Sequence, residues 1–81
     1  MSGEDLRALL RTRPFRPFTM TLVDGTRVRV PRADWAMVSP NGQTMIAYEA
    51  ARGPCVIIDT DRVTAIGYDP PPPEPDVVVQ G

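Results

Sequence analysis

Residues 18–30 read FTMTLVDGTRVRV, two alternating runs of apolar and polar side chains around an Asp-Gly pair. Such alternation is typical of β-strands with one buried face. Asp24-Gly25 is a common two-residue hairpin loop, but that loop would pair Met20 with Arg29 and so place an arginine opposite a core residue. The hydrophobic pattern therefore argues against the two-residue loop.

A three-residue loop over residues 23–25 keeps all the apolar side chains of this hairpin on one face. It also turns Arg27 and Arg29 outward, and it predicts a left-handed Gly25 with a bulge at the turn. The pairs that this register predicts are Phe18–Val30, Thr19–Arg29, Met20–Val28 and Thr21–Arg27.

A short amphipathic helix is expected before the hairpin, from residue 2 to residue 12. Ser2 is a suitable N-cap, and Asp5 stands at the capping-box position three residues later. Leucines at positions 6, 9 and 10 form one apolar stripe. Pro14 disfavours helical geometry at Arg13 and ends the helix.

A doubled Arg-Pro-Phe triplet, residues 13–18, joins the helix to the first strand. The two prolines favour an extended connector. Alternating arginine and phenylalanine could bind a single strand of nucleic acid, with the arginines contacting phosphates and the phenylalanine rings stacking on bases. A core this small, however, needs both of its phenylalanines. We therefore interpret Phe15 and Phe18 as anchors of the connector in the core.

Further short strands follow, separated by turn signals. The Ser39–Gly42 segment fits a type I turn, and the apolar run of residues 55–58 is typical of a strand covered on both faces. The sequence thus predicts a mainly β fold: a small curved β-barrel or sheet of five or six short strands with an N-terminal capping α-helix. The later strands are expected over residues 35–38, 43–49, 55–58 and 63–68, with a turn at 50–53 and a one-turn helix at 59–62.

The domain is expected to span residues 1–69, and residues 70–81 form a proline-rich extended tail. Five prolines within six residues cannot pair in a sheet and make a stiff spacer. The three valines at its end, Val77, Val78 and Val79, are candidates for binding a partner by adding a strand to its sheet. The other interpretation is a disordered, solubilising tail.

Composition excludes several kinds of catalytic chemistry. The chain has no histidine, no lysine and one cysteine, so it lacks a Ser-His-Asp triad, a Schiff-base lysine and a zinc site built on His and Cys. Cys55, beside three apolar residues, is interpreted as a core residue, and Trp35 likewise. Asp59 and Asp61 have the spacing of a Mg²⁺ pair, but capping of the helical turn, by Asp59 or Thr60, is the preferred interpretation. We expect no enzyme activity, no cofactor, no metal and no small-molecule substrate.

Charge is distributed unevenly along the chain. Residues 1–32 carry a net charge of +4 and residues 33–81 a net charge of −5. The asymmetry indicates either an anionic partner or mutual neutralisation within the fold. The candidate residues for nucleic-acid or anion binding are Arg13, Arg16, Arg27, Arg29 and Arg32.

The chain also resembles a family of short, uncharacterised bacterial proteins. The resemblance covers about residues 4–68 and rests on the leucine-rich start, the doubled Pro-Phe of residues 13–18, Asp24-Gly25, and the stretches 56–59 and 63–66. It implies a single-domain fold and no catalytic or binding residue. In element order the chain is also similar to Sm-like and SH3-like small barrels, an analogy at the level of fold.

Two functions are compatible with these features. The first is a non-enzymatic protein-interaction or assembly module that binds itself or a larger protein through strand edges and the tail. The alternative is a small barrel that binds nucleic acid, RNA in particular, through its arginines, although the acidic second half opposes this. No segment is long and apolar enough to span a membrane, and a single cysteine agrees with a cytoplasmic location.

Overall fold

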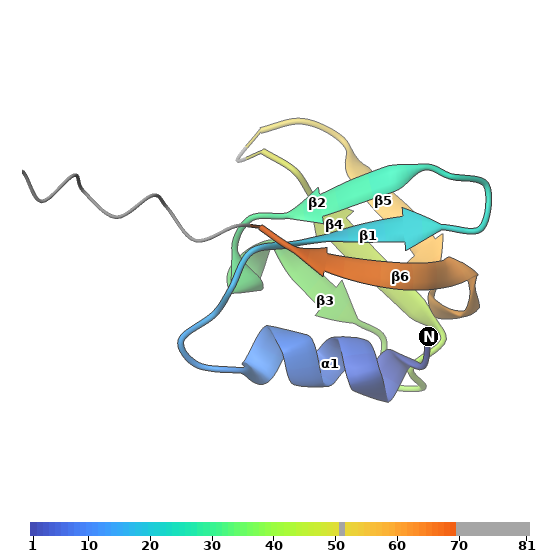
Figure 1. The fold of residues 1–81 in the computed structure, drawn as a ribbon, viewed down its shortest axis with the longest axis horizontal. Helices are drawn as coiled ribbons and strands as arrows, with labels where there is room; N and C mark the ends of the chain where they lie inside the picture. Colours follow the sequence, from blue (N-terminus) through green and yellow to red (C-terminus); the bar gives the residue numbers. More distant parts are fainter. Residues whose placement is uncertain (51, 70–81) are drawn as a thin grey trace, which may run out of the picture.

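The computed structural model describes residues 1–50 and 52–69. In these residues the chain forms one α-helix, six strands and two single-turn 3-10 helices (Figure 1). This confirms the expected mainly β fold with an N-terminal helix. In chain order the elements are α1 (Gly3–Arg11), β1 (Phe18–Leu22), β2 (Arg27–Val30), η1 (Ala33–Trp35), β3 (Ala36–Val38), β4 (Thr44–Tyr48), β5 (Cys55–Asp59), η2 (Thr60–Arg62) and β6 (Val63–Tyr68).

The strands form two antiparallel sheets of three strands each. The first sheet has the order β2-β1-β6 and the second has the order β3-β4-β5. Within the described residues no strand pairing joins the two sheets, so they do not close into a barrel. Of the two expected forms, a curved barrel or a sheet, the structure has open sheets. Pro31 and η1 interrupt the chain between β2 and β3, and η2 interrupts it between β5 and β6.

Helix α1 begins and ends as the sequence predicts. Ser2 is its N-cap, and the Ser2 hydroxyl accepts a hydrogen bond of 3.2 Å from the N–H of Asp5. Thr12 is the C-cap, and the Arg13–Pro14 peptide bond that follows is cis. Leu6 is fully buried, and the other two leucines of the stripe pack against the core. No helix in residues 1–50 and 52–69 is long and apolar enough to cross a membrane.

The β1–β2 hairpin has the predicted register, with all four predicted pairs present. Gly25 has a φ of 88°, and its N–H donates to the carbonyl of Leu22 at 2.9 Å. The N–H of Leu22 in turn donates to the carbonyl of Thr26 at 2.8 Å, which closes the three-residue loop. Asp24 accepts a hydrogen bond from the N–H of Thr26, and this bond lowers the pKa of Asp24 below its ordinary value of 3.8.

The strand expected over residues 35–38 is one residue shorter in the structure. Trp35 ends η1, and its N–H donates to the carbonyl of Arg32 at 3.2 Å rather than to a neighbouring strand. Trp35 is half-buried and lies outside the cluster of buried side chains. The interpretation of Trp35 as a core residue is therefore wrong, because the turn, and not a strand, sets its direction.

A turn and a buried threonine lie together at one end of the second sheet, where β4 begins and β5 ends. The N–H of Gly42 donates to the carbonyl of Ser39 at 2.9 Å, which confirms the predicted turn. Thr60, the buried polar residue among those described, donates its hydroxyl to the carbonyl of Gly42 at 2.7 Å. The predicted one-turn helix is present as η2 with Asp59 at its N-cap, but no side chain makes a capping bond there, so that part of the prediction is wrong.

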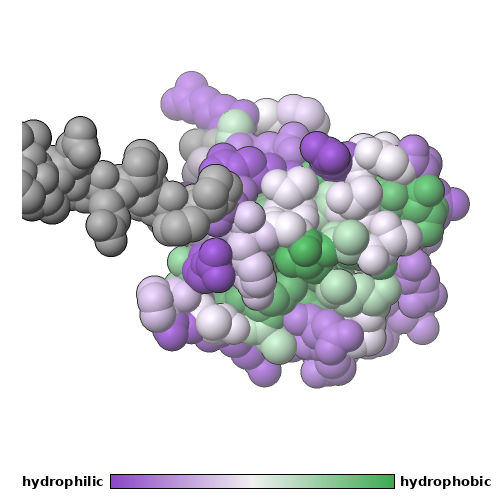
Figure 2. Space-filling view, in the orientation of Figure 1, coloured by the Kyte–Doolittle hydropathy of each residue, from purple (hydrophilic) through white to green (hydrophobic). Residues whose placement is uncertain are grey.

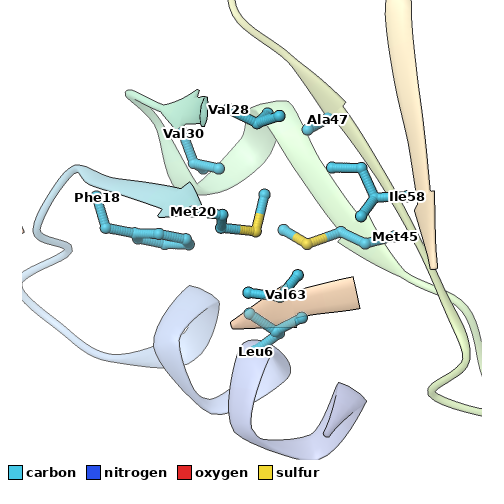
Figure 3. Packing of buried hydrophobic residues seen from close by; sticks show 9 residues of the cluster. All are labelled: Leu6, Phe18, Met20, Val28, Val30, Met45, Ala47, Ile58 and Val63. Carbon is cyan, nitrogen blue, oxygen red and sulfur yellow. The ribbon is translucent and has the colours of Figure 1, made fainter. Parts of the chain in front are cut away.

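The core lies between the two sheets and is closed at one end by α1 (Figure 3). Side chains of β1 and β2 meet those of β4 and β5, and Met20 and Met45 point toward each other at the centre of this view. The buried apolar residues are Leu6, Phe18, Met20, Val28, Val30, Met45, Ala47, Ile58 and Val63.

The doubled Arg-Pro-Phe triplet anchors the connector in this core. Phe18 is fully buried, and Phe15 packs against the cluster while remaining half-buried. Their ring centroids lie 6.0 Å apart, with the planes tilted by 59°. The interpretation of the two phenylalanines as core anchors is confirmed.

Strand β5 is covered on one face only. Ile58 is buried and Val56 packs against the core, whereas Cys55 is exposed and Ile57 is 69% exposed. The expectation of a strand covered on both faces is therefore wrong for the single chain. The interpretation of Cys55 as a core residue is also wrong, because alternation along the strand turns Cys55 outward with Ile57.

Candidate interaction surface

The outer face of the second sheet carries a row of apolar side chains across all three strands. Met37 in β3 is paired with Ile46 in β4, and Ile46 is paired with Ile57 in β5. Met37 is 60% exposed, Ile57 is 69% exposed and Ile46 is half-buried. Side chains paired across antiparallel strands are close enough to touch. The three residues therefore form one exposed apolar strip.

A second pair of residues extends this strip. Tyr48 in β4 is paired with Cys55 in β5, on the same side of the sheet as Ile46 and Ile57. Tyr48 is 40% exposed, and Cys55 is exposed. Contiguous exposed apolar residues are typical of interaction sites on proteins. We call this surface the apolar face: Met37, Ile46, Tyr48, Cys55 and Ile57.

The free edge of β5 adjoins the apolar face. The N–H of Thr60 donates to the carbonyl of Gln43 at 3.0 Å. These two residues are the next pair after Thr44 and Asp59, so the bond continues the β4–β5 ladder by one residue. Hydrogen-bonded and non-hydrogen-bonded pairs alternate along an antiparallel ladder. The alternate residues of β5, which are Cys55, Ile57 and Asp59, therefore direct their N–H and C=O groups away from β4. Within the described residues no strand pairs with them on that side.

The other three sheet edges carry features that oppose pairing. In the second sheet, β3 packs against α1, and the Arg7 guanidinium donates to the carbonyl of Ser39 at 2.6 Å. In the first sheet, β2 presents two arginines, and the carboxylate of Glu49 accepts the N–H of Arg29 at 2.9 Å. Gly67 weakens β6 as a template for pairing. Charged side chains and covered edges are common protections against edge-to-edge association, and β5 has an apolar centre instead.

The predicted arginines are all exposed, but they do not form one basic surface. Arg27 and Arg29 project from the outer face of the first sheet, as predicted. Arg29 forms an ion pair of 2.6 Å with Asp69, and the two line a groove that also contains Arg27 and Glu49. Two carboxylates thus offset two guanidinium groups at this groove.

Arg13 and Arg32 line a separate groove together with Phe15. The guanidinium of Arg32 pairs with Asp34 at 3.1 Å, and this hydrogen bond lowers the pKa of Asp34 below its ordinary value of 3.8. Arg16 lies over the ring of Tyr68, with 4.4 Å between its guanidinium carbon and the ring centroid.

Figure 2 views the molecule from the side of β1, β6 and α1. Weakly polar residues cover the strands in this view, hydrophobic residues show near the middle, and hydrophilic residues lie around the margins. The strongly hydrophilic residues on this side therefore lie mainly around a weakly polar surface.

The remaining candidate residues do not gather into a chemical site. Within the described parts of the chain, no group of three or more His, Cys, Asp or Glu residues is placed to hold a metal ion. The Asp59 and Asp61 pair thus has no third ligand there. Val77, Val78 and Val79 lie outside the described residues.

Comparisons with family models, with curated proteins and with solved structures found no match to this chain.

Proposed function

We propose that this protein is a small, non-enzymatic interaction module that associates with copies of itself through the second sheet. The observation that carries the proposal is the apolar strip of Met37, Ile46 and Ile57, which ends at the free edge of β5. Homo-oligomers in which one surface meets its own copy are the commonest protein assemblies.

The sequence pattern of β5 supports this proposal. The run Cys55–Ile58 is apolar at inward and outward positions alike, a pattern that strands covered on both faces usually show. In the single chain only the inward face is covered. A second copy on the outward face would provide the missing cover.

The free energy of burial also favours association. Full burial of an Ile or Met side chain contributes about 1.5–3 kcal/mol, and Met37 and Ile57 are both more than half exposed. A domain of this size has a small core, and oligomerisation is a common way for small domains to bury more apolar surface.

Light scattering on the full chain tests the proposal. We expect a mass above that of the monomer at high protein concentration, with dissociation on dilution. The double substitution Met37→Asp with Ile57→Asp is expected to give a monomer, because both side chains lie on the proposed interface and both are exposed. Thermal unfolding of the variant checks that the fold is retained.

Ala8→Asp is the matched control for this experiment. Ala8 is exposed on α1, which packs against β3 at the opposite edge of the second sheet from β5, so its substitution should leave association unchanged. A wild-type chain that stays monomeric at high concentration contradicts the proposal. The same measurement on a chain that ends at Asp69 shows whether Val77, Val78 and Val79 contribute to association.

A second candidate function is binding of single-stranded nucleic acid. It is favoured by the groove in which Arg13 and Arg32 lie beside Phe15. Proteins bind single-stranded nucleic acid by pairing cationic side chains with the phosphates and stacking aromatic rings on the bases. The ion pairs of Arg29 and Arg32 with carboxylates weaken this candidate, as does the separation of the arginines into two grooves.

Fluorescence anisotropy with mixed-sequence single-stranded RNA and DNA distinguishes the two functions. The interaction module is expected to show no binding at moderate salt. Binding at low salt that falls steeply as salt rises, and that is lost on Arg13→Ala with Arg32→Ala, would support the nucleic-acid function instead. Arg11→Ala, which removes an exposed arginine elsewhere on the surface, is the control.

A further inference from the structure

We infer that two copies of this chain pair through their β5 edges, antiparallel and centred on Ile57, to form one continuous six-stranded sheet. This inference rests on the proposed self-association and specifies its interface and register. It is carried by three properties of the described residues: the direction of the edge hydrogen-bonding groups, the alternation of side chains along β5, and the charges at the two ends of the strand.

The hydrogen-bonding groups select the register. Cys55, Ile57 and Asp59 direct their N–H and C=O groups away from β4, as derived above from the bond between Thr60 and Gln43. When Ile57 faces Ile57 of the second copy, each Cys55 faces Asp59 of the other copy. All three outward-directed residues of each strand then lie in hydrogen-bonded pairs. The register can change only in steps of two residues, because outward-directed residues alternate along the strand. If Cys55 faced Ile57 of the second copy, Asp59 would have no partner residue in the other β5 strand.

The same register extends both layers of side chains. On the inner face, Val56 of one copy lies opposite Ile58 of the other, so apolar residues continue across the junction. On the outer face, Ile57 lies opposite Ile57 of the second copy, and the strip of Met37, Ile46 and Ile57 continues into its own repeat. Contact between β-branched side chains across a strand pair is favourable.

The charges around β5 favour the antiparallel arrangement. Arg52 precedes the strand, whereas Asp59 ends it and Asp61 follows in η2. The end that contains Asp59, Asp61 and Arg62 has a net negative charge. Antiparallel pairing brings Arg52 of each copy near Asp59 and Asp61 of the other, while parallel pairing would place these aspartates beside their own counterparts.

Disulfide trapping tests the register on the full chain. In a Cys55→Ser background, Ile57→Cys is expected to form a covalent dimer under mild oxidation. The Cα atoms of a hydrogen-bonded antiparallel pair are about 5.5 Å apart, within the range of a disulfide. Asp59→Cys with the native Cys55 retained is expected to cross-link as well, because these two positions face each other between copies. In each case the mass doubles on a non-reducing gel.

Two controls distinguish cross-linking that depends on the proposed register from cross-linking by random collision of exposed thiols. The wild-type Cys55 is exposed but lies about 13 Å from its own counterpart in this register, so the unmodified chain should not cross-link. Ala8→Cys in the Cys55→Ser background places an exposed thiol on α1, at the opposite edge of the second sheet from β5, and should also stay monomeric on the gel. Exposure of 69% at Ile57 makes the Ile57→Cys substitution compatible with the fold.

The outcomes distinguish this inference from the proposed function. A chain that is monomeric by light scattering overturns both. A chain that associates, but whose Ile57→Cys variant cross-links no more than the Ala8→Cys control, overturns the β5 pairing and leaves self-association standing. Association into rings with an odd number of copies likewise excludes the two-fold β5 interface.

Discussion

Phe18→Ala is expected to lower the free energy of unfolding by about 3–5 kcal/mol, the usual cost of removing a large aromatic side chain from a core. Phe18 is fully buried and is among the largest side chains in the cluster between the two sheets. Small domains are stable by only about 5–15 kcal/mol. This one substitution therefore removes much of the stability of the fold.

Urea unfolding measures this effect. The fluorescence of Trp35, the single tryptophan, reports on η1, which contacts α1, and circular dichroism reports on the strands. Phe15→Ala is the matched control, because Phe15 is half-buried at the rim of the same cluster and its loss should cost less than half as much. Equal losses for the two variants would contradict the assignment of Phe18 as the main anchor.

Gly3→Ala is expected to destabilise the protein by about 1–3 kcal/mol, the usual range for overpacking. An added Cβ at Gly3 would lie 2.5 Å from the Cα of Gly42 and 2.6 Å from its carbonyl carbon. These are backbone atoms of the turn before β4, and they cannot move without displacing the turn. Helix propensity alone predicts the opposite sign, since alanine is favoured over glycine in a helix by about 1 kcal/mol.

Gly67→Ala is the control for this prediction. A Cβ at Gly67 would meet no atom within 4 Å, so this substitution should be close to neutral. Thermal or urea unfolding of both variants gives the comparison. Stabilisation by Gly3→Ala would show that α1 and the Ser39–Gly42 turn are not in close contact.

Local chemistry made the helix and the first hairpin predictable. Ser2, the leucine stripe and Pro14 determine α1, and each acts over a few residues of chain. The hairpin register follows from the side on which apolar residues lie, which a shift of one residue would reverse. The residues that end each element, Pro14 for α1 and Asp24-Gly25 for the hairpin turn, lie within or next to that element. The bounds of both elements therefore agree with the prediction to within one or two residues.

The candidate interaction surface was not predicted, because it depends on which strands are edges. The apolar run of residues 55–58 led to the wrong expectation of a strand covered on both faces, because the sequence does not say that only one face meets this chain's own core. Met37, Ile46 and Ile57 lie far apart in the sequence, and only the pairing of β3 with β4 and of β4 with β5 brings them into one row.

The sequence by itself determined the mainly β fold, the helix cap, the register of the first hairpin and the anchoring role of the two phenylalanines. These features follow from side-chain alternation and turn chemistry within short segments. The tertiary structure alone decided the division of the strands into two sheets, the outward direction of Cys55 and Ile57, and the contact between Gly3 and Gly42. Each of these depends on atoms that are distant in sequence, and strand order and burial are fixed only when those atoms pack together.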